Sequence, residues 1–351
     1  MRLRNPVVVL LAVSLGSLCA NVVRAGPVTG TTYIYVANDS TTDTITYSAT
    51  TGGTSTTLLN TVTGSDPHQI VIGNFGNSEN YLFVANDSST GSVSEYLTNG
   101  DVVNTSLITG LSSPVGLAVS GDDLFVANYN TGIIGEYVLN ANGQVTASTA
   151  DFITLPTAAK AGPDSLLASG GDLYVAATGT GDVYGYTTAG ASLAGFTTIT
   201  GIGYNNANGG AGSLNDPIGL AVSNGDLFVA DSNTSGVDAN SIGEFNASTG
   251  ATINAQLIST GLSSPTYLAV NTNGDLLVAN HGSTTVGEYT TSGGTVNASF
   301  ITGLTSPFGI AVGVAVPLPP VWLTFAACAG MVLIFRQVRR RGVDSHAVTC
   351  L

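Results

Sequence analysis

The chain has 351 residues, enough for one large domain or two small ones, and only 9% of them are charged. Its formal net charge is −14, and Lys160 is the one basic residue between Arg24 and Arg336, so the central part repels nucleic acid and anionic lipid and excludes both as its partners. The low charge and the many small polar residues argue against long surface helices and favour strands joined by tight turns.

Residues 1–25 have the pattern of a secretory signal peptide. A basic start containing Arg2 and Arg4 is followed by an apolar run over 7–18 and then by residues that permit cleavage. We therefore expect an exported protein, located at the cell envelope, on the outer surface or in the extracellular space. Two alternatives stay open, an uncleaved anchor and a lipoprotein attached through Cys19.

Residues 26–315 are periodic, and each repeat begins with a proline that leads an apolar strand. The leading prolines are about 42 to 54 residues apart, and they are Pro67, Pro114, Pro163, Pro217, Pro265 and Pro307. Repeats of this length with strand-like content indicate the blades of a β-propeller. The region contains no cysteine, which excludes a disulfide framework, a zinc–cysteine cluster and a thiol nucleophile there.

Each repeat has the same internal order, which predicts four strands. A Leu-Ala-Val strand is followed by a hairpin turn such as Asn224-Gly225, and then by an apolar second strand such as 227–230. The third strand carries Gly-Glu-aromatic, and a Thr-rich fourth strand leads to the next proline. The repeated glutamates are predicted to form a solvated or inter-blade polar stripe, and they are Glu95, Glu136, Glu244 and Glu288.

The periodic region begins and ends with incomplete repeats. Residues 33–38 match a second strand with no proline-led strand before them, and residues 306–312 match a first strand with nothing after them. We predict that the two segments pair and complete a sixth blade, which leaves no open sheet edge. The fold class is therefore all-β, a six-bladed β-propeller closed by strands from both ends. Over about residues 31 to 313 the chain resembles propellers of the NHL and lactonase-like kind.

Enzymes on such propellers usually place ligands where the inner strands open onto the central channel. The residue after each leading proline is predicted to lie there, which gives His68, Val115, Asp164, Ile218, Thr266 and Phe308. His68 and Asp164 alone can act as acid, base or ligand, so we predict that they form a binding site at the channel mouth and that the chain has no catalytic residue. The alternatives are a His68/Asp164 pair that acts in catalysis or shares a metal ion, and purely structural roles.

No resident cofactor or metal is predicted, with calcium as the alternative. A lactonase-like calcium site needs several converging oxygen ligands, and four of the six positions after the prolines supply no strong ligand. The ends of the second strands offer a ring of oxygens at Asn38, Asn86, Asn128, Asp231 and Asn280. Because such residues recur in nearly every blade, we interpret them as capping groups of turns.

The C-terminal part contains a candidate membrane segment. Residues 321–335 are uncharged and span about 22 Å as a helix, short of a hydrocarbon core of about 30 Å. Residues 314–320 extend this to a marginal span, and the arginines that follow favour the cytoplasmic side. We therefore predict a transmembrane helix that leaves the central part outside the cytoplasm.

Residues 316–341 also resemble the PEP-CTERM sorting tail of Gram-negative bacteria, in its VPLP…WL variant. The matching residues are Val316, Pro317, Leu318, Pro319, Trp322, Leu323, Arg339, Arg340 and Arg341. The resemblance implies cleavage by an exosortase-like enzyme and a bacterium that makes exopolysaccharide and biofilm. Pro320 and the short tail over 342–351 depart from the family pattern, and an ordinary C-terminal anchor is the alternative.

Together these observations favour a non-catalytic surface or matrix protein that binds extracellular polysaccharide or surface proteins, through a propeller held at the envelope. The alternative function is a metal-dependent lactonase or related hydrolase of the gluconolactonase-like propeller class. A bound divalent ion with enough converging ligands at one channel mouth favours the enzyme. A channel lined by Val115, Ile218 and Phe308 favours the binding protein.

The sorting tail predicts a processed form of the protein. We expect the intact mass of protein recovered from cells to lack everything after about Pro319, because the resemblance places cleavage near that motif. Mass spectrometry of the intact protein measures this directly. Retention of the whole tail would reduce the segment to a simple anchor.

Overall fold

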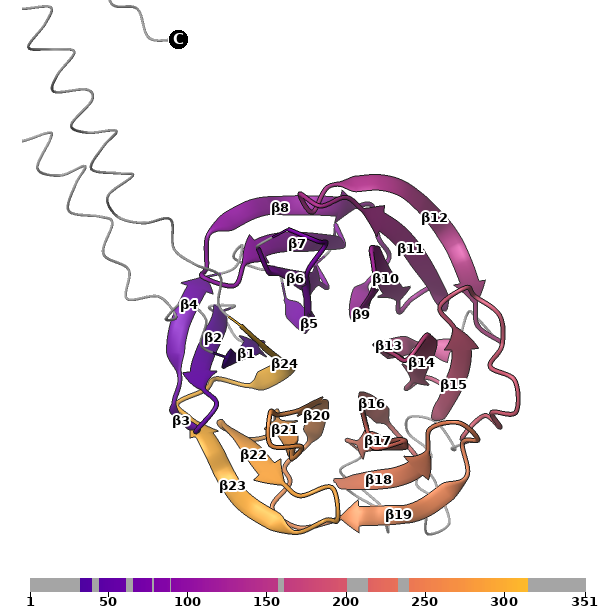
Figure 1. Cartoon of the computed structure of the whole chain (residues 1–351). Helices are drawn as coiled ribbons and strands as arrows, with labels where there is room; N and C mark the ends of the chain where they lie inside the picture. Colours follow the sequence, from indigo (N-terminus) through magenta and orange to yellow (C-terminus); the bar gives the residue numbers. More distant parts are fainter. Residues whose placement is uncertain are drawn as a thin grey trace, which may run out of the picture.

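The computed structural model describes residues 32–39, 44–60, 66–77, 79–88, 90–156, 161–200, 214–232 and 240–314. These residues form six sheets around a central channel, which confirms the all-β, six-bladed propeller (Figure 1). The predicted signal peptide at 1–25, the sorting and transmembrane segment at 316–341 and the short tail at 342–351 lie outside the described residues. Within the described ranges there is no helix of the length and apolar character needed to cross a membrane.

In each blade the first strand lies next to the channel and the last strand lies at the rim (Figure 1). The first two blades consist of β5 (Pro67–Gly73), β6 (Tyr81–Asn86), β7 (Ser92–Leu97) and β8 (Val102–Thr109), and of β9 (Pro114–Ser120), β10 (Asp123–Asn128), β11 (Ile133–Leu139) and β12 (Val145–Thr154). The third consists of β13 (Pro163–Ser169), β14 (Asp172–Ala177) and β15 (Asp182–Thr187). The fourth consists of β16 (Pro217–Ser223), β17 (Asp226–Asp231), β18 (Ser241–Asn246) and β19 (Thr252–Ile258).

The remaining two blades show how the ring closes. The fifth consists of β20 (Pro265–Val270), β21 (Leu276–Asn280), β22 (Thr285–Tyr289) and β23 (Thr295–Thr302), and the sixth of β24 (Pro307–Val314), β1 (Thr32–Asn38), β2 (Thr44–Ala49) and β4 (Thr56–Asn60). β24 pairs antiparallel with β1, with Tyr35 opposite Ala311, so the predicted sharing of one sheet by the two ends is confirmed. A short extra strand, β3 (Gly53–Thr54), pairs parallel with β23 and ties the sixth blade to the fifth.

The third blade differs from the prediction of four strands per repeat. Its described residues form three strands, and two isolated bridges, one of them Val183 to Ile199, stand where a fourth strand was expected. The ring of Phe196 covers Gly185, and a turn begins where Leu193 donates its backbone N–H to the carbonyl of Gly185 at 2.9 Å. Among the described residues of this blade, the ring of Phe196 thus lies against the third strand at Gly185.

The hydrophobic core lies between neighbouring blades rather than in a single centre. The second strands are almost completely buried, as expected for strands covered on both faces, and Phe83 and Phe125 are fully enclosed. One cluster joins Tyr35 of the closing blade to Leu82 and Tyr96 of the next blade. Closure of the ring therefore buries apolar surface between the sixth and the first blade, as happens between the other neighbouring blades.

The inner strands come close together near the channel axis. In three blades the second residue after the leading proline is glycine, and these are Gly116, Gly219 and Gly309. A Cβ atom at Gly219 would overlap the carbonyl oxygen of Thr266 in the next blade, and one at Gly309 would overlap the carbonyl oxygen of His68. Because the obstructing atoms belong to the backbone, only glycine allows this approach.

We predict that Gly219→Ala lowers the free energy of unfolding by about 1 to 3 kcal/mol, because the added methyl group forces two inner strands apart. Urea unfolding followed by circular dichroism measures the change. The control is Gly294→Ala on an exposed turn, where the nearest atom to the new Cβ belongs to the flexible side chain of Thr290 and the change should stay within about 0.5 kcal/mol. Equal effects of the two substitutions would contradict the close approach of the inner strands.

Candidate functional site at the channel mouth

One end of the channel, called the mouth here, is formed by the same three positions in every blade. They are the residue before the leading proline, the residue after it and the residue that follows the second strand. In blade order they are Asp66, His68 and Asp87; Ser113, Val115 and Tyr129; Gly162, Asp164 and Thr178; Asp216, Ile218 and Ser232; Ser264, Thr266 and His281; and Ser306, Phe308 and Asp39.

A repeated backbone hydrogen bond positions these residues. In the first blade, Asp87 donates its backbone N–H to the carbonyl oxygen of Asp66 at 3.0 Å, and the equivalent bond occurs in the other five blades. The residue before the proline has a positive φ in five blades, for example 52° at Asp66. The turn therefore places the side chains at the first and third positions next to each other.

His68 lies within the mouth and is largely enclosed. Its ring centroid is 4.4 Å from that of Phe308, and its Nε2 atom is 4.0 Å from Oδ2 of Asp87. Burial lowers the pKa of His68, against the raising effect of Asp87 and Asp39. The neutral imidazole is therefore favoured, which is the form that can bind a metal ion.

A second imidazole lies on the other side of Phe308. The ring centroid of His281 is 5.4 Å from that of Phe308, and its Nε2 atom is 3.8 Å from Oδ2 of Asp39. The nearby imidazole of His281 holds the pKa of Asp39 below its usual value. The mouth thus presents one aromatic ring between two imidazole groups, each with an aspartate beside it.

Asp164 lies deeper than His68 and has a different partner. The hydroxyl group of Tyr267 donates to the carbonyl oxygen of Asp164 at 2.7 Å, with its Oδ1 atom at 3.3 Å. Burial, with the neighbouring charge of Asp216, raises the pKa of Asp164 to about 7. Asp164 is thus placed beside Tyr267, and His68 beside Asp87 and Phe308. A binding role for His68 and Asp164 stays a prediction.

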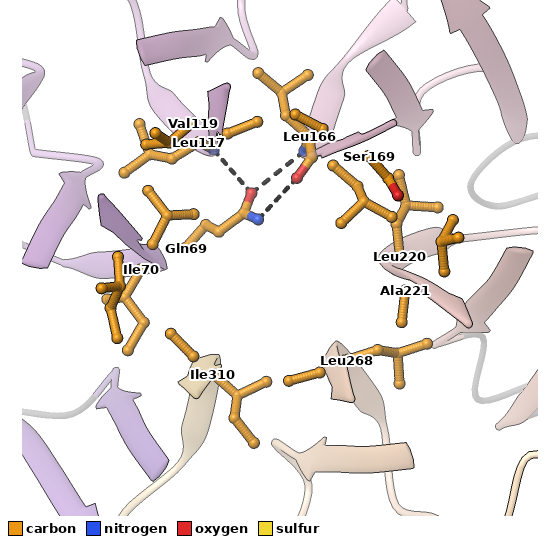
Figure 2. A pocket seen from close by; sticks show the side chains of 18 of the residues that line it. Gln69, Ile70, Leu117, Val119, Leu166, Ser169, Leu220, Ala221, Leu268 and Ile310 are labelled. Carbon is orange, nitrogen blue, oxygen red and sulfur yellow. Dashed lines mark hydrogen bonds between the residues drawn. The ribbon is translucent and has the colours of Figure 1, made fainter. Parts of the chain in front are cut away.

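Two side chains that the sequence interpretation missed cross the channel axis. Tyr267 reaches from β20 to the carbonyl oxygens of Val115 and Asp164 in two other blades. Gln69 of β5 donates from Nε2 to the carbonyl of Leu166 at 2.9 Å, and its Oε1 atom accepts the backbone N–H of Leu117 at 2.8 Å (Figure 2). These hydrogen bonds link inner strands of different blades. The side chains of Tyr267 and Gln69 occupy the channel below the mouth.

A sequence signal for this cross-link exists two residues after each leading proline. That position holds Gln69, Gly116, Ser165, Gly219, Tyr267 and Gly309. Four blades have a small residue there, and two have a long polar one. The residue directly after the proline, from which the mouth was predicted, does not show this contrast.

The opposite end of the channel, called the apolar end here, is lined mainly by aliphatic side chains. A cavity of about 340 Å³ opens there, with Gln69 in its wall (Figure 2). Its other lining residues include Ile70, Leu117, Leu166, Leu220, Leu268 and Ile310. Thr32 pairs with Val314 at this end, so both ends of the described chain leave the propeller on the side away from the mouth. The described residues that line this cavity include no titratable side chain, whereas the mouth contains His68, Asp87 and His281.

The oxygens at the ends of the second strands serve their own blades. Oδ1 of Asn38, Asn128 and Asn280 each accepts a backbone N–H from the segment that enters the inner strand, at 3.0 to 3.2 Å. Both carboxylate oxygens of Asp231 accept backbone N–H groups in the same way. The interpretation as capping groups is confirmed for these four residues, whereas Asn86 donates from Nδ2 to Oγ of Ser94 at 2.9 Å.

The glutamate stripe is more buried than expected at two of its positions. Glu95 is 1% exposed and Glu288 is 5% exposed, with Glu288 accepting a hydrogen bond from Asn271 at 2.7 Å. Burial raises the pKa of Glu95 to about 7. Gly143 of the next blade lies against its carboxyl group, so this part of the stripe is inter-blade rather than solvated.

Comparison with known proteins supports the fold. Residues 214–237 match the NHL repeat family, and no curated protein sequence matches the chain. The structure is similar to a chain of a nidogen/laminin complex (14% identity, TM-score 0.59, covering 81% of this chain and 98% of that one). It is also similar to a protein from Bacteroides uniformis assigned as a 6-phosphogluconolactonase (15%, TM-score 0.54, 81% and 100%) and to a gluconolactonase from Xanthomonas campestris (15%, TM-score 0.53, 85% and 99%). At these identities the likeness shows the fold alone.

The raised pKa of Asp164 predicts that stability falls as pH rises. Its folded-state pKa of about 7 lies above the ordinary value of 3.8, so the stabilising contribution is complete below about pH 4 and is lost as pH rises through about 7. Asp164→Asn should therefore lose less stability between about pH 4.5 and pH 8 than the wild type, in urea unfolding. The exposed Asp151→Asn is the control and should follow the wild type. Parallel curves for wild type and Asp164→Asn would refute the prediction.

Proposed function

We propose that this chain is an exported, non-catalytic binding protein that presents its mouth to extracellular polysaccharide. The observation that carries the proposal is the closure of the axis by Tyr267 and Gln69. Lactonase-like chemistry in a propeller needs several polar ligands that converge in the channel, and here the channel below the mouth is crossed by side chains bound to backbone groups. What remains for a ligand at the polar end of the channel is the rim of the mouth.

The groups at the rim suit a sugar. Phe308 offers a half-buried aromatic ring of the kind against which the apolar face of a pyranose packs. Asp39 and Asp87 are carboxylates that can accept hydrogen bonds from sugar hydroxyl groups. The net charge of −14 repels polyanions, so a neutral or cationic polysaccharide is the favoured ligand.

The direction of the chain ends agrees with this role. Thr32 and Val314 lie side by side at the apolar end, so segments that flank the propeller start on the side opposite the mouth. A signal peptide at 1–25 and a PEP-CTERM-like tail at 316–341, cut by an exosortase-like enzyme or kept as a membrane anchor, would bring the propeller to the envelope. In that arrangement the mouth points away from the attached side.

A metal-dependent lactonase or related hydrolase is the second candidate function. Two observations favour it: the similarity of fold to a gluconolactonase and the grouping of Asp66, His68 and Asp87 at the mouth. An enzyme of this kind would work at the rim, since the axis is filled. Its activity would require a metal ion and would depend on His68.

We predict that native electrophoresis through gels containing chitosan or dextran retards the full-length protein. Phe308→Ala should weaken the retardation at least about threefold, because it removes the ring from the rim. Val102→Thr, at a 63% exposed position on β8 at the outer rim of the propeller, is the matched control and should migrate as the wild type.

The same preparation separates the two functions. Hydrolysis of δ-gluconolactone, followed by pH-stat with added Ca²⁺ or Zn²⁺, should stay at the uncatalysed rate. Metal-dependent hydrolysis that disappears in His68→Gln would overturn the binding proposal in favour of the hydrolase. Migration unchanged by either polysaccharide would reject the proposed ligand class.

A further inference from the structure

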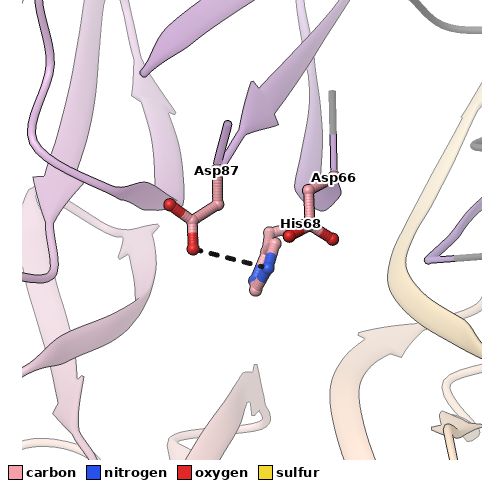
Figure 3. Close-up of side chains that lie close together, drawn as sticks. All are labelled: Asp66, His68 and Asp87. Atoms are coloured by element: carbon pink, nitrogen blue, oxygen red, sulfur yellow. Dashed lines mark ion pairs between the residues drawn. The ribbon is translucent and has the colours of Figure 1, made fainter. Parts of the chain in front are cut away.

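We infer that Asp66, His68 and Asp87 form a site for one divalent transition-metal ion of the Zn²⁺ type at the mouth. Each residue offers one ligand atom, and the three atoms lie within 4.8 Å of one another (Figure 3). The inference concerns the metal ion alone, and it shares Asp87 with the rim carboxylates and all three residues with the second candidate function above.

The distances between the ligand atoms suit side chains that share one ion better than side chains that hydrogen-bond to each other. Nε2 of His68 is 4.0 Å from Oδ2 of Asp87, which is too long for a hydrogen bond. Zinc binds nitrogen and carboxylate oxygen at about 2.0 to 2.2 Å, so two ligand atoms on one ion are at most about 4.4 Å apart. The observed separations therefore need only a small closing movement of half-buried side chains.

Neither nitrogen of His68 has a hydrogen-bond partner among the described residues. Nδ1 is buried and unpaired, and Nε2 has only the distant carboxylate of Asp87. The side chain is 15% exposed, and Phe308 packs against its ring. An imidazole nitrogen without a partner is unfavourable, and a metal ion bound at Nε2, which faces Asp87, satisfies that atom.

The surrounding charge favours a cation. Asp39 is within hydrogen-bonding reach of Asp66, and its charge also acts on His68. Three carboxyl groups thus gather around one imidazole, and no Lys or Arg lies at any mouth position of the six blades. A divalent ion would relieve the repulsion among these carboxylates.

The repeat itself shows that the first blade is special. The repeated turn holds the residue before the proline next to the residue after the second strand, and in this blade all three mouth positions carry groups that bind metals. Each other blade has at most one aspartate or histidine at these positions, the others being Ser, Gly, Thr, Tyr, Val, Ile or Phe. We therefore expect one ion per chain.

The donor set selects the kind of metal. One imidazole and two carboxylates suit zinc and similar transition metals, whereas Ca²⁺ takes six to eight oxygen ligands and no nitrogen. The side chain of Asp87 is 28% exposed and that of His68 is 15% exposed, so water or a ligand from solution can reach the remaining coordination positions.

Isothermal titration of the metal-stripped full-length protein with Zn²⁺ tests the inference. We expect a stoichiometry of one and an affinity that falls at least about tenfold in His68→Gln and in Asp87→Asn. His281→Gln, which removes the other imidazole of the mouth, is the matched control and should bind as the wild type. Mg²⁺ and Ca²⁺ in excess should not displace the zinc.

Thermal unfolding provides the second readout. Zn²⁺ should raise the melting temperature of the wild type and of His281→Gln, and should leave that of His68→Gln unchanged. Melting curves without metal verify that each variant is folded, and Asp87→Asn replaces His68→Gln if the latter fails to fold. Absence of binding at about 100 µM Zn²⁺, or an equal loss in His68→Gln and His281→Gln, would overturn the proposed site.

Discussion

The structure depends on how six strands can meet at one narrow axis. Tyr267 and Gln69 cross that axis and bond to backbone groups of other blades, and Gly116, Gly219 and Gly309 let neighbouring inner strands approach each other closely. Long-range hydrogen bonds of this kind hold the inner strands in a fixed arrangement. They also divide the channel into a polar mouth and an apolar end.

This division gives the two ends of the propeller different physical roles. The apolar end has an aliphatic wall, and the chain enters and leaves the propeller there. The mouth contains Asp39 and Asp87, His68 and His281, and the half-buried Phe308. Because Tyr267 crosses the axis below the mouth, a ligand or metal ion held by the polar groups of the mouth would lie at its rim. Both proposals made for this chain follow from that restriction.

Much of the fold could be predicted because each blade repeats the same local chemistry. The spacing of the leading prolines, the apolar second strands and the unmatched segments at 33–38 and 306–312 predicted six blades and their closure, as observed. The outer part of the third blade was not predicted. There Phe196 packs onto Gly185, a contact that depends on a fold-back which strand patterns do not encode.

The sequence by itself determined the repeat length, the fold class, the acidic character of the body and the placing of His68 and Asp164 near the channel. Only the tertiary structure decided which groups meet there. Asp87 stands beside His68 because a hydrogen bond to Asp66 closes the turn between two strands, and Tyr267 reaches Asp164 because the ring is narrow at that level. Distances across a closed ring arise from the packing of all six blades together, so no single stretch of sequence specifies them.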